Sequence, residues 1–346
     1  MNVSQALKAL SHGEILSESE AESVLSDIVD ENPSQLQVAA LLGILRGRGE
    51  SVSELTGFAR TLRARAIPVK CESFPLIDTC GTGGDAPKVG AGTFNISTAA
   101  SFIASAAGAK IAKHGNRAVS SKSGSADVLE SLGVHLNLSP DAIARGIDQI
   151  GIGFMFAPNH HPAMKAVGPL RRELGIRTVF NLLGPLGNPA GATRQVMGVP
   201  AQKWLRPIAQ TLQNLGCERA FVVHSQDGLD EFSTCAPTDF LEIRDGEILQ
   251  HRLEPDFLGL SCLDAKHLSG GDAGQNAVII QQILHDGEGP SADISCLNAA
   301  AILLLADLAD NWPDALKLAR ATVSSGAARE KLSQLQGFTE QYNRTK

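Results

Sequence analysis

The stretch FPLIDTCGTGGD, Phe74 to Asp85, decides the fold because it joins a short apolar strand to a glycine-rich loop. Ser97 to Gly108 follows as an alanine-rich helix that ends at a glycine, and Ala109 to Ala112 has the pattern of the next strand. A strand, a loop, a helix and a second strand form a β-α-β unit, and such a unit requires a parallel sheet. The sequence therefore predicts an α/β domain with a central, mostly parallel sheet.

Further elements extend this unit toward the C-terminus. Ser139-Pro140 predicts the start of a helix, because proline is favoured in the first helical turn. Buried strands are predicted at Ile152 to Phe156 and Arg219 to His224, and a hairpin at Phe240 to Arg252 around the tight-turn pair Asp245-Gly246. From Asp293 onward the apolar pattern is helical again.

The first 65 residues precede the β-α-β unit and are predicted to be helical. Three capping boxes, each a serine followed three residues later by Glu or Gln, open segments with apolar residues at helical spacing. These boxes are Ser17 with Glu20, Ser34 with Gln37, and Ser51 with Glu54. We expect a small helical domain whose apolar faces serve a core or a subunit interface.

Composition narrows the class of function and the expected location. The formal net charge is −7, and this acidic balance argues against a nucleic-acid partner, since such partners require a basic surface. The six cysteines show no C-x-x-C pair, so we expect reduced thiols and no zinc site. The longest apolar run, Ala299 to Ala306, is too short to cross a membrane, and no signal peptide is apparent. These features predict a cytoplasmic protein with no membrane partner.

Three segments of the β-α-β unit have the composition of an anion site. Glycines 81, 83 and 84 allow close approach of a phosphate, although the same glycines also form turns that bind nothing. The segment Thr93 to Thr98 places hydroxyls at a helix start, where unpaired N–H groups bind phosphate, unless Ser97 or Thr98 is only an N-cap. The segment Lys113 to Ser125 adds cations and hydroxyls, which either contact a pyrophosphate or form a solvated basic loop.

Two later segments carry other candidate groups. Asp230-Glu231 offers adjacent carboxylates of the kind that bind Mg²⁺ together with substrate phosphates, or forms a solvated turn. The pair His160-His161 has no further metal ligand at a recognisable spacing, so we expect a surface or structural role. Arg171 or Arg172 either binds a substrate carboxylate or pairs with acidic neighbours.

Taken together, these motifs resemble those of the anthranilate phosphoribosyltransferase family. The resemblance runs in order along nearly the whole chain. It comprises GTGGD from residue 81, TFNIST from 93, KHGNRAVSSKSGSADVLE from 113, HHPAMK from 160, RRELGIRTVFNLLGPLGNP from 171, DGLDE from 227 and LNAA from 297. GTGGD alone is moderately specific, whereas the ordered set is highly specific.

The resemblance implies a fold, an assembly and a reaction. The fold is of the nucleoside phosphorylase/phosphoribosyltransferase type, with a helical domain at residues 1–70, joined by helices from about 170–190, and an α/β domain at residues 71–346. The assembly is a homodimer formed through the helical domains. The reaction transfers the phosphoribosyl group of phosphoribosyl pyrophosphate to anthranilate with Mg²⁺ as cofactor, a step of tryptophan biosynthesis.

The resemblance also implies the residues of the site. Phosphoribosyl pyrophosphate would be contacted by Gly81, Gly84, Asp85, Thr93, Asn95, Ser97, Thr98, Lys113, Ser121 and Ser125. Mg²⁺ would be held, directly or through water, by Ser97, Asp230 and Glu231. Anthranilate would be bound by Asn116 and Arg171, with Gly81, His114, His161 and Pro185 along its approach.

One departure from the family falls beside the glycine loop. Residues 86–92, Ala-Pro-Lys-Val-Gly-Ala-Gly, make the segment between Asp85 and Thr93 longer than is usual for the family. Two alternatives share parts of the pattern. A pyrimidine nucleoside phosphorylase would have the same architecture with a different basic segment at 113–117, and a nucleic-acid-binding relative would have a basic surface and altered substrate motifs.

Overall fold

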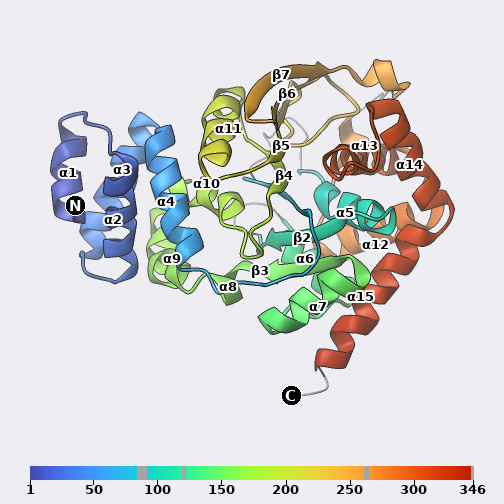
Figure 1. The fold of residues 1–346 in the computed structure, drawn as a ribbon, viewed down its shortest axis with the longest axis horizontal. Helices are drawn as coiled ribbons and strands as arrows, with labels where there is room; N and C mark the ends of the chain where they lie inside the picture. The colour runs from blue at the N-terminus through green and yellow to red at the C-terminus, as the bar shows by residue number, and fades with distance from the viewer. Residues whose placement is uncertain (84–91, 119–121, 261–264, 344–346) are drawn as a thin grey trace.

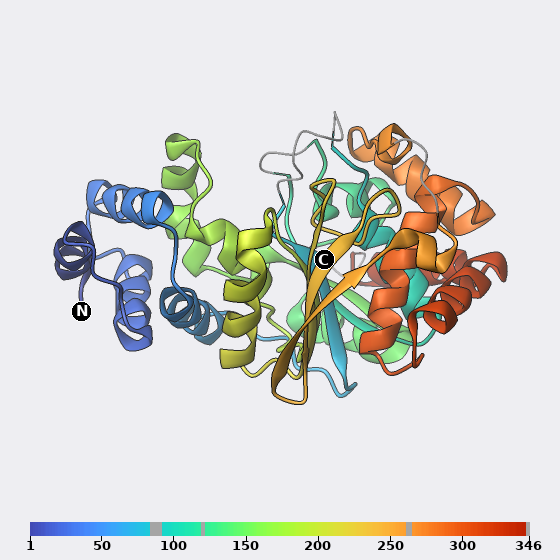
Figure 2. The ribbon, with the colours of Figure 1, turned by 90° about the horizontal axis from the view of Figure 1, so that it is seen from above.

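The computed structural model describes residues 1–83, 92–118, 122–260 and 265–343. In Figure 1 a bundle of N-terminal helices lies at one end of the molecule, and a sheet lies between two groups of helices in the remainder. Figure 2 shows the same arrangement from above, with the N-terminal helices set apart from the sheet. Candidate residues Gly84, Asp85 and Ser121, and most of the long segment after Asp85, fall outside the described residues.

The N-terminal bundle consists of α1 (Val3–Ser11), α2 (Glu18–Val29), α3 (Gln35–Arg48) and α4 (Val52–Ala64). The three predicted capping boxes are confirmed at the starts of α2, α3 and α4, and a fourth, of Asn2 with Gln5, opens α1. Two later helices, α9 (Ala163–Leu174) and α10 (Val179–Leu186), pack against this bundle and share its apolar core. The bundle is therefore completed by a segment that follows the first half of the sheet.

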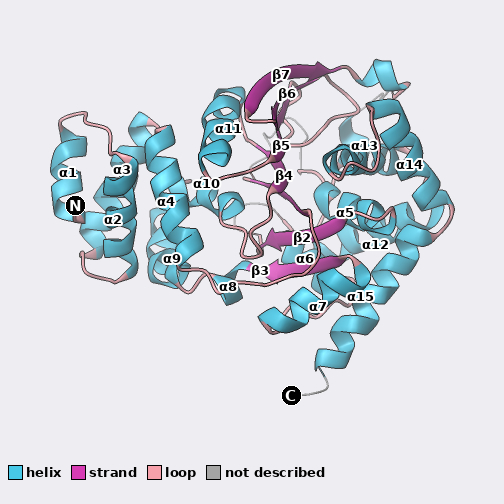
Figure 3. Cartoon of the chain, in the orientation of Figure 1, coloured by secondary structure: helices cyan, strands magenta, loops and turns pink. Residues whose placement is uncertain are grey.

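The sheet has seven strands in the order β3-β2-β1-β4-β5-β6-β7. Their bounds are β1 (Leu76–Gly81), β2 (Lys110–Gly115), β3 (Ile152–Phe156), β4 (Arg194–Gly198), β5 (Arg219–Ser225), β6 (Thr238–Arg244) and β7 (Glu247–Leu253). The first five strands are parallel, and β6 and β7 form the predicted antiparallel hairpin. Figure 3 shows these strands as a band between helices, which confirms the α/β fold class predicted from the sequence.

Helices cover both faces of the sheet. One face packs on α5 (Ile96–Ala106) and on α12 (Ala273–Asp286), α13 (Pro290–Leu305), α14 (Trp312–Ser324) and α15 (Ala327–Asn343), which share one apolar core. The other face packs on α7 (Pro140–Ile150), α10 and α11 (Leu205–Asn214). Two short helices, α6 (Ser125–Ser131) and α8 (Ala157–His160), follow β2 and β3.

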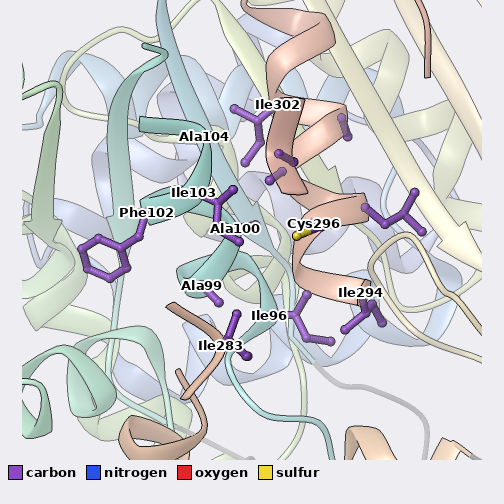
Figure 4. Close-up of a cluster of buried hydrophobic side chains, with 14 of the residues drawn as sticks. Ile96, Ala99, Ala100, Phe102, Ile103, Ala104, Ile283, Ile294, Cys296 and Ile302 are labelled. Atoms are coloured by element: carbon purple, nitrogen blue, oxygen red, sulfur yellow. The ribbon is translucent and has the colours of Figure 1, made fainter. Parts of the chain in front are cut away.

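Helices α5 and α13 make a close pair under the sheet. Figure 4 shows α5, with Ala99, Ala100 and Ala104 labelled, beside α13, with Cys296 and Ile302 labelled, in one buried apolar cluster. Small side chains let two helix backbones approach closely, and the buried apolar area stabilises their relative position. This packing holds the N-terminal end of α5 beside the C-terminal end of β1.

The structure tests three expectations from the sequence, which concern the strands, the cysteines and the possibility of a membrane span. Strand β4 is absent from those expectations, because its five residues include Arg194 and Gln195 and show no continuous apolar run. The expectation of reduced thiols is wrong for Cys235, which is disulfide-bonded, whereas Cys71, Cys80, Cys217 and Cys296 are free. No helix in the described part of the chain is long and apolar enough to cross a membrane.

Candidate active site

The candidate site lies where the strand order reverses. From β1 the chain moves to β2 and β3 on one side, and it later returns to β4 and β5 on the other. In open α/β sheets, ligands bind outside the carboxyl ends of the strands at such a switch point, because the two outgoing loops part there. Gly81 ends β1 and pairs with Gly198, which ends β4. The predicted glycine loop therefore begins at the switch point.

The paired glycines create room for Asp230. A Cβ added to Gly81 would overlap the Asp230 carboxylate and lie 3.1 Å from its Cγ, while a Cβ on Gly198 would overlap the backbone carbonyl of Asp230. Asp230 is buried between the two strand ends, with 7% of its surface exposed. The carboxylate is therefore directed at the start of the glycine loop, and the solvated-turn interpretation of Asp230 is wrong.

Asn298 of α13 holds the chain next to this carboxylate pair. Its side-chain amide donates to the carbonyl of Phe232 at 2.9 Å, and its side-chain oxygen accepts from the Phe232 N–H at 3.0 Å. Phe232 itself packs edge-on against Phe221 and Phe240 in the buried core. Asn298 is thus a positioning residue for the Asp230-Glu231 loop, and the sequence motif that contains it carries no such signal.

Glu231 contacts the N-terminal end of α5. Its Oε1 accepts a hydrogen bond of 3.0 Å from the Ser97 N–H. The N–H groups of Ile96, Thr98 and Ala99 are bonded to backbone carbonyls of Phe94 and Asn95. The expectation of unpaired N–H groups at this helix start is therefore wrong, and a phosphate that bound the Ser97 N–H would displace the Glu231 carboxylate.

The hydroxyl-bearing segment before α5 has two kinds of side chain. Asn95 is the N-cap residue of α5 by position, and its side chain bonds to Ser123 and Asn276 instead of to the helix. Ser97 and Thr98 lie within the first turn, so the N-cap alternative for either of them is wrong. Thr98 Oγ1 is buried and has no hydrogen-bond partner among the described residues. An unpaired buried hydroxyl is costly unless a ligand or water satisfies it.

Lys113 of β2 reaches the same place from the neighbouring strand. Its Nζ donates to the Thr79 carbonyl, to Thr79 Oγ1 at 3.1 Å and to Ser97 Oγ at 3.3 Å. Burial lowers the pKa of the Lys113 ammonium, and the carboxyls of Asp78 and Glu231 oppose that shift. The side chain is 3% exposed, so the solvated-loop alternative is wrong for Lys113.

Arg117 of the same segment, whose guanidinium lies 5.4 Å from the ring centre of Phe156, is placed differently from Lys113. Arg117 forms ion pairs with Asp127 and Glu130 of α6 and lies largely in solvent. Ser125 is the first residue of α6, and its hydroxyl occupies the space that a side chain at Gly115 would need. Thr93 forms an isolated bridge with Ser269. The sequence pattern alone does not distinguish Arg117 from Lys113.

A second group of candidates lies between the sheet and α8 to α10. The rings of His114 and His161 have their centres 4.9 Å apart, and His160 donates from Nδ1 to the Ile67 carbonyl at 3.0 Å. All three histidines are buried, so a surface role for His160 and His161 is wrong. Burial lowers the pKa of His161 to about 4 and lowers the pKa of His114 as well. At neutral pH these two rings are therefore uncharged.

Arg171 lies on α9 with its guanidinium 5.6 Å from the ring centre of Phe180 in α10. Burial alone lowers the pKa of the Arg171 guanidinium, and no ion pair of Arg171 is found within the described residues. The alternative, that Arg171 pairs with an acidic neighbour, is therefore not observed. Pro185 of α10 accepts a 2.8 Å hydrogen bond at its carbonyl from the side chain of Gln195 in β4. Asn116 follows the last residue of β2, and its side chain is exposed.

Two charged residues of the site region lie outside the sequence-predicted set. Asp78 of β1 is fully buried and accepts a 3.1 Å hydrogen bond from the His114 N–H, while burial raises the pKa of its carboxyl. Its signal is a charged residue within an otherwise apolar strand. Arg177, between α9 and α10, donates from Nη2 to the Thr82 carbonyl at 2.8 Å. Arg177 gives no local signal, because its partner lies 95 residues away.

Comparison with known proteins places both parts of the chain in one family. Residues 73–329 match the glycosyl transferase family, a/b domain, and residues 4–66 match the helical bundle domain of the same family. An anthranilate phosphoribosyltransferase of Thioalkalivibrio sulfidiphilus is 48% identical over 98% of this chain and 99% of its own length. One of Clostridium kluyveri is 47% identical over 97% of this chain and 99% of its own length.

The chain belongs to the anthranilate phosphoribosyltransferase family.

Solved structures of this family have the same fold. Anthranilate phosphoribosyltransferase from Thermus thermophilus superposes with a TM-score of 0.90 at 41% identity, covering 97% of this chain and 99% of that one. The Saccharomyces cerevisiae enzyme in complex with PRPP and Mg superposes with a TM-score of 0.89 at 26% identity, covering 98% of both chains. The helical bundle beside a larger α/β domain is therefore the architecture of the family.

Proposed function

We propose that this protein transfers the phosphoribosyl group of phosphoribosyl pyrophosphate to anthranilate, giving N-(5-phosphoribosyl)anthranilate and pyrophosphate in tryptophan biosynthesis. One observation carries the proposal: Lys113, Ser97 and the Asp230-Glu231 pair, from distant parts of the chain, meet at the strand ends where the glycine loop begins. Near-full-length relatedness to anthranilate phosphoribosyltransferases supports the same activity.

The donor half of the site would hold the sugar pyrophosphate at the glycine loop. Lys113 supplies a buried cation, and Ser97, Thr98 and Ser125 supply hydroxyls. We retain Gly81, Thr93 and Asn95 as further contacts, together with the undescribed Gly84, Asp85 and Ser121. The Asn95 side chain already makes hydrogen bonds within the protein, so it would exchange one of them or contribute through its backbone.

The same half of the site fits a magnesium ion. Asp230 and Glu231 provide two hard oxygen ligands, and Ser97 provides a hydroxyl. The described residues hold no group of three or more His, Cys, Asp or Glu side chains that could bind a metal ion without a substrate. Mg²⁺ commonly takes one or two carboxylates and completes its shell with substrate phosphates and water. When bound, the ion would neutralise the charge of the departing pyrophosphate.

The acceptor half would bind the aromatic amine between β2 and α8 to α10. Arg171 would pair with the carboxylate of anthranilate, and Asn116 would orient the amine. Uncharged His114 and His161, with Gly81 and Pro185, would line the aromatic ring's approach. A half-buried guanidinium that forms no ion pair within the described residues supports this assignment of Arg171.

The reaction needs positioning more than proton transfer. The amine nitrogen forms a bond to C1 of the ribose, the C1–O bond breaks, and the electron pair leaves with pyrophosphate. An aryl amine is uncharged at neutral pH, so its lone pair is available and we assign no general base. The surplus proton of the product passes to solvent. Lys113 would stabilise the leaving charge, and Arg171 would hold the acceptor in line with C1.

Assembly, domain limits and location complete the proposal. We propose a homodimer through the helical domain, supported by exposed Leu36 of α3 and Ile15. We also propose the domain limits 1–70 and 71–346, with α9 and α10 joining the first domain, as their shared core suggests. A cytoplasmic location agrees with a biosynthetic role.

The test mixes the protein with phosphoribosyl pyrophosphate, Mg²⁺ and anthranilate and follows pyrophosphate release, then repeats this with other aminobenzoates. Loss of Arg171 in Arg171→Ala should raise the anthranilate KM about 10- to 100-fold, as expected for a charged hydrogen bond of about 1.5–3 kcal/mol. Arg172→Ala, an exposed neighbour on α9, is the matched control. A rise in the sugar-pyrophosphate KM alone would contradict the assignment, and absence of pyrophosphate release would contradict the function.

A further inference from the structure

The two halves of the proposed site belong to different structural units. The donor half lies at the strand ends of the α/β domain, whereas Arg171 and Pro185 lie on α9 and α10, which share the core of the N-terminal bundle. A transfer reaction requires the donor and the acceptor to be aligned with each other. A contact that joins these two units at the site therefore affects the alignment of the reactants.

Arg177 makes such a contact. It lies between α9 and α10, and its Nη2 donates to the carbonyl of Thr82 at 2.8 Å. Thr82 is 6% exposed, and its N–H donates to the Gly198 carbonyl at 3.0 Å, which extends the pairing of β1 with β4 by one residue. Gly83 follows with a φ of +64°. The Thr82 carbonyl is therefore at the point where the strand ends and the glycine loop begins.

The connection that carries Arg177 is short and anchored at both ends. Gly175 ends α9 in the left-handed conformation, and its N–H donates to the carbonyl of Arg171 at 3.3 Å. Thr178 opens α10, and its N–H donates to the Asn181 side chain at 3.0 Å. Contacts thus run from the glycine loop through Arg177 and its short connection to the backbone of the proposed acceptor-binding arginine.

We propose that Arg177 is a positioning residue that couples binding of the sugar pyrophosphate at the glycine loop to binding of the aromatic acceptor beside α9 and α10. This inference rests on the proposed function. A ligand bound beside Gly81 to Gly83 would fix the orientation of the Thr82 carbonyl, which accepts from Arg177 and so holds Arg177 and the end of α9 in one arrangement. Coupling between two sites is reciprocal, so the acceptor strengthens pyrophosphate binding by the same factor.

The chemistry of the contact explains why arginine suits this place. A guanidinium presents several N–H donors in a rigid plane. The hydrogen bond from Arg177 Nη2 to the Thr82 carbonyl therefore also fixes the orientation of the guanidinium. Lysine would keep the positive charge but lose the planar set of donors. A comparison of these two side chains therefore separates the geometry of the contact from the attraction of any cation for a diphosphate.

The experiment measures anthranilate binding by its fluorescence with and without inorganic pyrophosphate and Mg²⁺, a pair that cannot transfer a ribosyl group. In the unaltered protein we expect Mg²⁺-pyrophosphate to tighten anthranilate binding by about fivefold or more, within the usual range of coupling between sites. In Arg177→Ala the ratio of the two dissociation constants should fall to about one. Arg177→Lys should retain most of the pyrophosphate affinity and lose most of the coupling.

Arg172→Ala provides the control, since Arg172 lies on the same segment and its side chain is exposed. It should keep the ratio of the unaltered protein. Undiminished coupling in Arg177→Ala, or no coupling in the unaltered protein despite binding of both ligands, overturns the inference. A weaker affinity for pyrophosphate with coupling preserved also overturns it, because Arg177 would then act only as a charge. Failure of the unaltered protein to bind either ligand instead overturns the proposed function.

Discussion

Gly81→Ala tests whether the absence of a side chain at Gly81 makes room for the Asp230 carboxylate. The added methyl would overlap the nearer Asp230 carboxylate oxygen and lie 3.1 Å from Cγ, closer than nine in ten real Cβ contacts. The Asp230 backbone has little freedom to withdraw, because its carbonyl lies directly against Gly198. We therefore expect the Asp230 side chain to rotate to another staggered conformation, which moves its oxygens by roughly 2–3 Å.

The consequence should be large for the metal and small for the fold. Mg²⁺ binds oxygen at about 2.0–2.1 Å, so a displaced carboxylate no longer coordinates it. Disturbing a metal site in this way typically weakens affinity about 10- to 100-fold, equivalent to about 1.4–2.8 kcal/mol. Gly81 does not have a positive φ, so alanine suits its backbone, and unfolding free energy should change by less than about 1 kcal/mol.

The assay titrates Mn²⁺, a spectroscopic substitute for Mg²⁺, into the protein with pyrophosphate and follows free Mn²⁺ by electron paramagnetic resonance. Urea unfolding of the same samples checks the fold. Gly337→Ala of α15 is the matched control, because a Cβ there would meet nothing within 4 Å. Asp230→Asn should weaken Mn²⁺ binding comparably, and the double variant should be little worse than either change alone, since both remove one ligand.

A Gly81→Ala protein that binds Mn²⁺ as tightly as the unaltered protein would refute the reasoning. Such a result would mean that Asp230 is not a metal ligand or that its loop yields to the methyl group. Equal weakening in Gly337→Ala would show that the effect is not local to the strand ends.

Three further changes test other parts of the structure. Asn298→Ala removes the hydrogen bonds to the Phe232 backbone and should raise the Mg²⁺ concentration for half-maximal activity about tenfold, and an unchanged Mg²⁺ requirement would count against a positioning role. Glu54→Ala breaks the ion pair between Arg48 and the fully buried Glu54 carboxylate, and it should lower the free energy of unfolding in urea by about 3 kcal/mol. A decrease of less than about 1 kcal/mol would contradict this expectation. Burial lowers the folded-state pKa of His161 to about 4, below its ordinary 6.5, so the unfolded chain binds more protons in this interval and stability falls as pH drops. From this group alone, about 2 kcal/mol should be lost between about pH 7.5 and pH 5, and His161→Phe should show a correspondingly smaller loss.

Local features of the fold are predictable because they depend on neighbouring residues. The capping boxes of α2, α3 and α4 and the Asp245-Gly246 hairpin need only a few consecutive side chains. The β-α-β unit is recognisable because its strands and helix differ in apolar pattern. Strand β4 escapes prediction because its five residues show no continuous apolar run, although it supplies Gly198 and completes the switch point.

The sequence predicts which residues form the candidate site better than it predicts how their side chains are arranged in space. Lys113 and Asp230 are expected near an anion and lie buried at the strand ends. The helix-start N–H groups are expected to be unpaired, yet Glu231 already accepts from Ser97, 134 residues away along the chain. No local pattern could reveal that a candidate metal ligand also caps the candidate phosphate helix.

The sequence by itself determined the classes of element, the position of the glycine loop after a strand and the family resemblance, since each is carried by consecutive residues. Only the tertiary structure decided that β4 pairs with β1, that two glycines make room for Asp230 and that Arg177 joins the acceptor segment to Thr82. The physical reason is that these contacts join residues far apart along the chain, and strand order and core packing bring them together.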